Sequence, residues 1–125
     1  MYLHHDDDNV DGSQALLGEV VFTVVLVWTF LSAKKYFSES PLLYMLVVSA
    51  AQYAGIQIVS GVSAGFMNVA VSLGIKFVDA GEHDSDDLDD AWIYILGFLI
   101  GGALGAVLHW VLELGIKKTG ASKAQ

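Results

Sequence analysis

The sequence predicts an all-α membrane protein with three transmembrane helices and one re-entrant half-helix, and three features of its composition point to that class. Hydrophobic residues make up 54% of the 125 residues and gather in long blocks, while charged residues make up only 16%, against about 25% in an ordinary soluble domain. The chain has no cysteine, which excludes disulfides and thiolate zinc sites. It has no arginine and a net charge of −8, so it lacks the basic face that a nucleic-acid partner requires.

Three hydrophobic blocks are long enough to cross a bilayer, which takes about 20 mostly apolar residues. They cover Ala15–Ala33, Leu42–Val59 and Ala91–Leu112. The second block contains two glutamines, Gln52 and Gln57, as its strongest polar groups, and the third contains no charged residue. A soluble chain of this length has too little further structure to bury three such helices. We therefore expect each block to be a transmembrane helix.

The segment between the second and third blocks has a different pattern. Small residues predominate in Gly61–Gly65, and the apolar stretch that follows, Met67–Val78, has only 12 residues. That length is too short to span the membrane and suits a re-entrant half-helix. Asn68 stands where an N-cap would start such a helix. Because non-helical backbone at membrane depth must line a cavity or be buried in protein, the stretch Gly61–Asn68 is the predicted position of a pore or site.

The charged residues divide the chain into an acidic N-terminal tail (1–14), a membrane domain (15–116) and a lysine-containing C-terminal tail (117–125). Three crossings place the acid-rich segments 6–11 and 79–90 on one side of the membrane and five of the six lysines on the other. The positive-inside rule predicts that the lysine side faces the cytoplasm or the mitochondrial matrix. The five lysines are Lys34, Lys35, Lys117, Lys118 and Lys123.

The glycine-containing loop and its flanking spans resemble part of the aquaporin family, the major intrinsic proteins. Residues 61–74, GVSAGFMNVAVSLG, are similar to the second pore loop of that family, whose pattern is roughly G-x-S-G-G-x-x-N-P-A-R-S-x-G. Residues 92–104 are similar to the last helix of the family, and Gly18-Glu19 is similar to the start of its fourth helix. The resemblance extends over about residues 16–113 and implies the C-terminal half of an aquaporin-like fold.

This resemblance implies a pore built from two half-helices whose N-terminal ends meet at the centre of the membrane. The positive ends of their dipoles and an asparagine from each loop, here Asn68, would face passing water. It also implies that the Glu19 carboxylate accepts hydrogen bonds from backbone N–H groups of the loop 61–68, which is a structural role. Two other roles stay open for this carboxylate: a proton relay and contact with water at the end of the span.

The pore motif of this chain departs from the family pattern. Asn68 and Ala70 match it, whereas Val69 stands in the place of the proline and Val71 in the place of the arginine. Proline is favourable but not essential at the first position of a helix, so the first change is mild. The second change removes a fixed charge that would exclude ions at the constriction. Asn68 is therefore interpreted either as a water-binding group or only as the N-cap of the half-helix.

The remaining filter positions of the family pattern fall on Ile56 in the second span and Gly65 in the loop. With Val71 they would form an apolar, uncharged constriction that neither hydrogen-bonds a solute nor repels an ion by charge. The sequence also has three spans where an aquaporin monomer needs six. Nothing in it is therefore expected to supply the opposing half-helix.

Four glycines in the last span predict close helix packing, because glycine lets two helix backbones approach each other. Gly97, Gly101 and Gly105 repeat at four-residue spacing, and Gly102 lies beside them. His109 near the lysine-side end of the same span is interpreted as a residue of the membrane interface. We expect the glycine face to pack inside the fold or against a foreign subunit.

The sequence contains no constellation typical of an enzyme, a cofactor site or a metal centre. It has no nucleophile placed with a base and an orienting group, and no ligand cluster outside the tails. The histidines and aspartates of the N-terminal tail are interpreted as solvated groups. No enzymatic activity, no cofactor and no metal are therefore predicted.

Two functions from different classes remain. The first is a structural accessory subunit of a larger membrane complex, which keeps the fold to pack against other subunits and lipid and has lost the pore. The membrane expected for it is the mitochondrial inner membrane, with its respiratory assemblies. The second is half of a split channel for water or small neutral solutes, completed by a partner chain that carries the complementary half. The missing half and Val71 favour the first.

Overall fold

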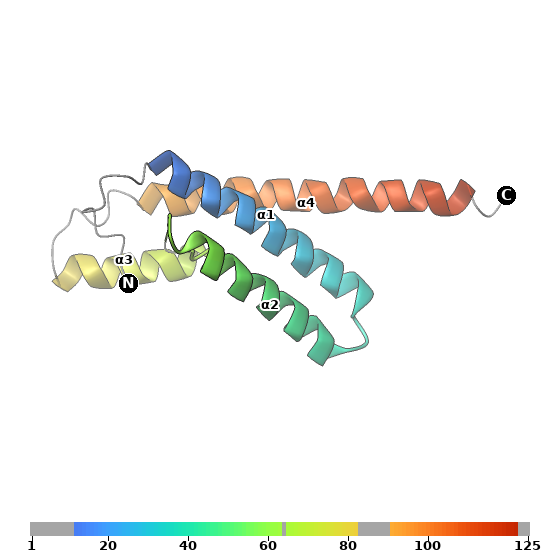
Figure 1. The fold of residues 1–125 in the computed structure, drawn as a ribbon, viewed down its shortest axis with the longest axis horizontal. Coiled ribbons are helices and arrows are strands. Elements are labelled where there is room, and N and C mark those ends of the chain that lie inside the picture. Colours follow the sequence, from blue (N-terminus) through green and yellow to red (C-terminus); the bar gives the residue numbers. More distant parts are fainter. Residues whose placement is uncertain (1–11, 64, 83–90, 123–125) are drawn as a thin grey trace.

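A computed structural model describes residues 12–63, 65–82 and 91–122, and all regular structure in these ranges is helical (Figure 1). Four helices follow one another along the chain: α1 (Gly12–Tyr36), α2 (Pro41–Val59), α3 (Val69–Glu82) and α4 (Ala91–Ser122). The predicted all-α fold class is confirmed.

Helices α1, α2 and α4 are each long and apolar enough to cross a membrane, and α3 contains a shorter apolar stretch. Most helix bounds lie within four residues of the predicted ones, whereas α4 ends ten residues beyond its predicted block. Helix α1 begins at Gly12, within the range assigned to the N-terminal tail, and α4 continues to Ser122, within the range assigned to the C-terminal tail. The half-helix begins at Val69 rather than Met67 and ends at Glu82. The pattern of two spans, a half-helix and a third span is the predicted one.

Helix α1 lies between α2 and α4 and packs against both, while α3 packs against α4 (Figure 1). The turn from α1 to α2 lies at one end of the molecule. Helices α1 and α4 begin at the opposite end, where α3 also lies. The last turns of α4 extend beyond the other helices. Helix α3 therefore covers the bundle only at the end at which α1 and α4 begin, and the rest of the bundle consists of α1, α2 and α4.

Three of the four glycines predicted to pack lie against α1. A Cβ atom at Gly97, Gly101 or Gly105 would come within 2.6–2.8 Å of an atom of that helix, closer than a side chain tolerates. Gly102 differs, because a Cβ atom there would meet nothing within 4 Å. It lies one residue further along α4 and so about 100° around the helix from Gly101. Gly102 therefore has no close packing contact inside the described chain, and its packing against a foreign subunit stays a prediction.

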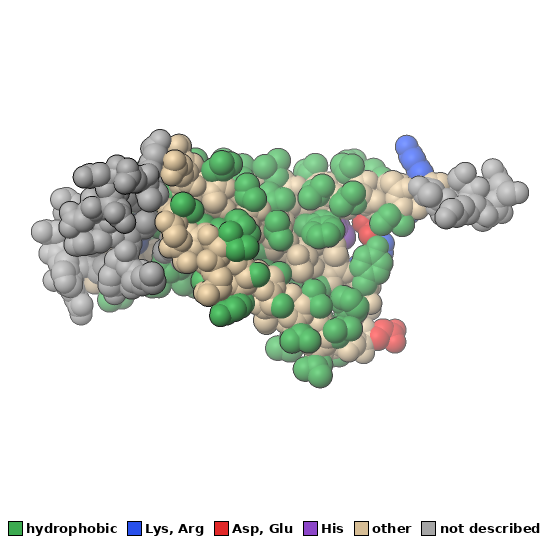
Figure 2. All heavy atoms as spheres, viewed as in Figure 1, with side chains coloured by type: hydrophobic (Ala, Val, Ile, Leu, Met, Phe, Trp, Pro, Cys, Tyr) green, Lys and Arg blue, Asp and Glu red, His purple; other side chains and the backbone are tan. Residues whose placement is uncertain are grey.

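The described part of the chain has polar side chains inside and large apolar side chains outside, the reverse of a soluble domain. Glu19, Thr23, Ser63 and Ser72 are at most 1% exposed, whereas Leu42 is 80% exposed. Figure 2 shows hydrophobic side chains spread along the helices and charged ones gathered towards one end. Such a surface requires lipid or protein around it. The chain is therefore an integral membrane protein.

Candidate functional site

The connection between α2 and α3, residues 60–68, turns back along α2 before α3 begins. The Ser63 backbone N–H donates to the Val59 carbonyl oxygen (2.8 Å), which closes the end of α2 as a turn. Gly65 then lies beside Ile56, one helical turn before the end of α2. A Cβ atom at Gly65 would lie 3.2 Å from the Ile56 Cα, and the φ angle of 64° at Gly65 also favours glycine.

Glu19 of α1 holds this loop through both of its carboxylate oxygens. Its Oε1 accepts a hydrogen bond from the Ser63 hydroxyl (2.6 Å), and its Oε2 accepts one from the Met67 backbone N–H (3.0 Å). Ser63 Oγ in turn accepts a hydrogen bond from the Gly65 backbone N–H (3.1 Å). The resemblance implied backbone donors alone, and the structure has one backbone donor and one hydroxyl. Glu19 is 1% exposed, so these contacts satisfy a carboxylate that has lost its water.

Met67 contributes a second constraint on the loop. Its φ angle is 45°, a conformation that is uncommon for a residue with a side chain. The side chain is 2% exposed and lies against α2, where a Cβ atom at Gly55 would be 2.7 Å from the Met67 Cε. Packing and the hydrogen bond to Glu19 together hold this unfavourable backbone conformation.

Asn68 starts α3 as its N-cap, in the place given by the sequence. Its Oδ1 accepts hydrogen bonds from the backbone N–H groups of Ala70 (3.0 Å) and Val71 (3.4 Å), and its backbone oxygen accepts one from Ser72 (3.0 Å). The side chain is exposed. The cap uses only its oxygen, so the Nδ2 amide stays available to donate to a solute. Both roles open for Asn68 are compatible with this geometry.

The other predicted pore-loop residues lie around Asn68 with different exposures. Val71 on the first turn of α3 is 47% exposed, whereas Gly65 is buried. Ala70 is also exposed and Val69 is half-buried. Gly61 lies further back in the turn, where a Cβ atom would meet nothing within 4 Å. The loop therefore presents Asn68, Ala70 and Val71 to the outside of the described chain.

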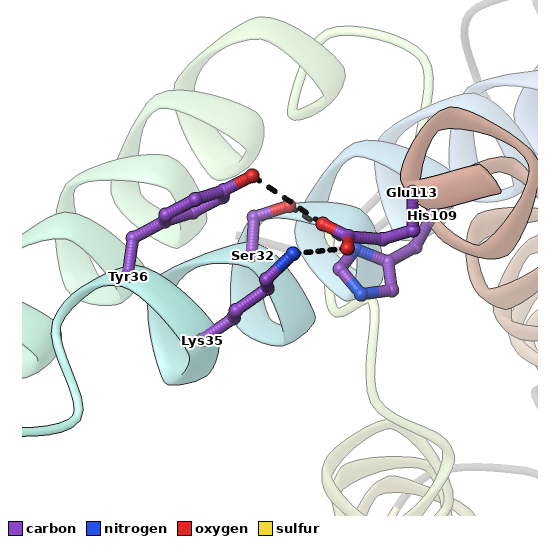
Figure 3. A network of polar contacts seen from close by, with 5 residues as sticks. All are labelled: Ser32, Lys35, Tyr36, His109 and Glu113. Carbon is purple, nitrogen blue, oxygen red and sulfur yellow. Dashed lines mark hydrogen bonds and ion pairs between the residues drawn. The ribbon is translucent and has the colours of Figure 1, made fainter. Parts of the chain in front are cut away.

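A second polar cluster joins α1 to α4 at the opposite end of the molecule (Figure 3). Lys35 forms an ion pair with Glu113, and the Tyr36 hydroxyl donates to the Glu113 Oε1 (3.3 Å). Ser32 Oγ lies 3.3 Å from the His109 Nδ1. His109 thus contacts α1, and it lies 13 residues before the end of α4, because this helix continues well beyond the predicted block. This cluster connects α1 and α4 on the lysine side.

Sequence reasoning missed two functional contacts at these sites. Ser63 is the first, although a small polar residue inside an apolar loop was a usable signal for a partner of Glu19. Lys35–Glu113 is the second, and the only acid in α4 was a usable signal for it. Within the described ranges, no group of three or more His, Asp or Glu residues is placed to hold a metal ion.

The three spans, the short helix α3 and the loop before it define an all-α membrane protein. Residues 2–109 match the family model of the major intrinsic proteins, and the chain belongs to that family. Members of the family are channels rather than enzymes, in agreement with the predicted non-enzymatic function. Comparison with curated proteins and with solved structures gave no significant match.

Proposed function

We propose that the chain forms one half of a membrane pore for water or small uncharged solutes. A second aquaporin-like half, from another segment or another chain, completes it. The contact of Glu19 with the loop carries this proposal. That contact fixes the loop so that Asn68 begins α3 with its side chain exposed. Burying a carboxylate in a membrane span is energetically costly, and here the carboxylate holds a loop whose sequence resembles a pore loop of the family.

The residues around Asn68 support a pore of loose selectivity. Ile56, Gly65 and Val71 carry no charge, so ions are not repelled by a fixed charge at this level. The Asn68 amide and the N-terminal end of α3 provide donors and a positive dipole end. These groups favour uncharged solutes that accept hydrogen bonds. We further propose that the lysine side faces the cytoplasm or the mitochondrial matrix.

The first experiment is the native size of the full chain in mild detergent, with mass-spectrometric identification of every co-migrating protein. The proposed pore predicts one partner that carries the complementary half. Vesicles containing that assembly should then shrink rapidly in a hyperosmotic medium.

Two variants of α3 make the flux assay specific. Val71→Trp places a large side chain at the proposed lumen and should abolish the flux. Phe77→Trp is the matched control, because Phe77 is also exposed (63%) but lies about 120° around α3 from Val71. Equal flux through both variants, or no flux through the parent assembly, would refute the pore.

A second candidate function is a structural accessory subunit of a larger membrane complex, such as a respiratory assembly of the mitochondrial inner membrane. The observation that favours it is Val71, which stands where the family pattern has an arginine. In this case the chain packs against other subunits through its exposed apolar helices. Migration within a large complex that contains unrelated enzyme subunits, without flux, would support this function instead.

A further inference from the structure

Helix α3 has one packed face, and a lysine lies in the middle of it. Val69, Ser72, Leu73 and Lys76 follow one another at the spacing of a single helix face. Among residues 69–78 these four are buried or half-buried, and the other six are exposed. Because α3 packs against α4, this face is the one that α3 turns towards α4. We call these four residues the packed face of α3.

The ammonium group of Lys76 lies over an aromatic ring of α4. Its Nζ is 5.5 Å from the centroid of the Tyr94 ring, within the distance of about 6 Å at which a cation and the face of an aromatic ring attract each other. Tyr94 is 3% exposed, so little water competes for this contact. A lysine on a packed face within a membrane is costly unless it has a partner, and the Tyr94 ring is such a partner.

The same ring contacts the re-entrant loop. The centroids of the Phe66 and Tyr94 rings are 5.5 Å apart and their planes are inclined by 56°, which is a usual arrangement for an aromatic pair. Phe66 directly precedes Met67, whose backbone N–H donates to Glu19. Tyr94 therefore connects α4 both to the loop and to the half-helix that follows it.

The contact between Lys76 and Tyr94 favours one rotation of α3 about its own axis. The attraction between an ammonium group and a ring face depends on direction, whereas apolar packing does not. An apolar side chain at position 76 would therefore tolerate several rotations. Val71 lies five residues before Lys76 and so about 140° around α3. The rotation that places Lys76 over the ring thus turns Val71 away from α4, where it is 47% exposed.

We infer that Lys76 is a positioning residue of the pore, which fixes the rotation of α3 through the Tyr94 ring and so presents Val71 to the lumen. This inference rests on the proposed pore function. Lys76 does not touch the solute, because it lies on the packed face of α3. It acts on the solute only through the side of α3 that it leaves exposed.

Distances between pairs of spin labels on the full chain in micelles test this rotation, and the chain has no cysteine that would bind a label elsewhere. Labels at Val71→Cys and Gly102→Cys report the position of α3 relative to α4, because both sites have open space around them. The parent should give one narrow distance distribution. Lys76→Met should widen it about twofold or more, because α3 then populates several rotations. Lys76→Arg keeps a cation that stacks on aromatic rings and should restore the narrow distribution.

Three controls make the widening specific. Labels at Met45→Cys, which is 62% exposed on α2, and Gly102→Cys should keep their distribution in Lys76→Met, since the spans stay in place. Lys118→Met removes a charge from an exposed site and should leave α3 unchanged. Tyr94→Leu removes the ring and should widen the distribution as Lys76→Met does. An unchanged distribution in Lys76→Met, or equal widening in Lys76→Arg, would overturn the inference.

Flux through the assembled pore separates this inference from the proposed function. Lys76→Met should lower the flux about twofold or more, because the competent rotation of α3 is then only partly populated, and Lys76→Arg should keep it. Widening with undiminished flux in Lys76→Met overturns the role of Lys76 in the pore. An unchanged distribution with flux through the parent overturns the inference and leaves the pore intact. No flux through the parent refutes the pore, and with it the positioning role.

Discussion

Two carboxylates make polar contacts between α1 and other parts of the chain, and their surroundings differ. Glu19 lies in α1 and binds the loop before α3, whereas Glu113 lies in α4 and binds Lys35 of α1. Glu19 is 1% exposed and binds the loop through a hydroxyl and a backbone N–H. Glu113, whose side chain is 15% exposed, pairs with Lys35, whose side chain is 43% exposed. A buried carboxylate whose partners would otherwise be orphaned is costly to remove, whereas an exposed pair contributes little. The two contacts therefore differ in what they do: the first shapes the pore loop and the second aligns two helices.

The largest effect is expected for Glu19→Ala, which leaves the Ser63 hydroxyl and the Met67 N–H buried without an acceptor. We expect the free energy of unfolding in mixed micelles to fall by about 3 kcal/mol, because each orphaned buried donor costs about 1–3 kcal/mol. Glu113→Ala is the matched control and should cause a clearly smaller loss. Equal losses for the two variants would contradict the distinction between them.

Substitutions of two neighbouring glycines in α4 test the packing between α1 and α4. Gly101→Ala should destabilise the bundle by about 1–3 kcal/mol, the usual cost of overpacking, because its Cβ would lie 2.6 Å from the Thr23 Cβ. Gly102→Ala should be neutral or slightly stabilising, since its Cβ meets open space and alanine favours the helix. Equal loss in both variants, measured by thermal unfolding in detergent, would show that α4 packs through another face.

A smaller effect is expected for the cap of α3. Asn68→Ala should cost about 1 kcal/mol of unfolding free energy through loss of the cap. Asn68→Asp keeps an acceptor for the Ala70 and Val71 N–H groups and should preserve stability. The Asp variant removes the amide donor, so it should reduce flux through the assembled pore. Unchanged flux in Asn68→Asp would show that Asn68 acts only as the N-cap of α3 and does not bind the solute.

The smallest effect is expected for the exposed pair. A double-mutant cycle with Lys35→Ala and Glu113→Ala should give a weak coupling that decreases as salt is added, because exposed ion pairs are screened. The same cycle for Glu19→Ala and Ser63→Ala should give a larger coupling with little dependence on salt. A larger coupling energy for Lys35 and Glu113 than for Glu19 and Ser63 would contradict the stronger role given to the buried contact.

The sequence alone predicts the three spans and the half-helix, because runs of apolar residues of stated length determine them locally. It also gives Asn68 as the N-cap, since a cap is a contact between residues two or three positions apart. The partners of Glu19 and Lys35 lie 44 to 78 residues away, and their pairing depends on how the helices rotate against each other. The same rotation decides that Gly101 packs and Gly102 does not, although the sequence treats them alike.

The exchange of the Met67 backbone amide with deuterated solvent, measured by NMR in micelles, tests most directly that Glu19 holds the re-entrant loop. This N–H donates to the Glu19 Oε2, so it should be strongly protected in the parent chain. In Glu19→Ala the protection should fall sharply at Met67, while amides within α4 keep theirs. Equal protection of the Met67 amide in both chains would contradict the account, because the loop would then be held without this carboxylate.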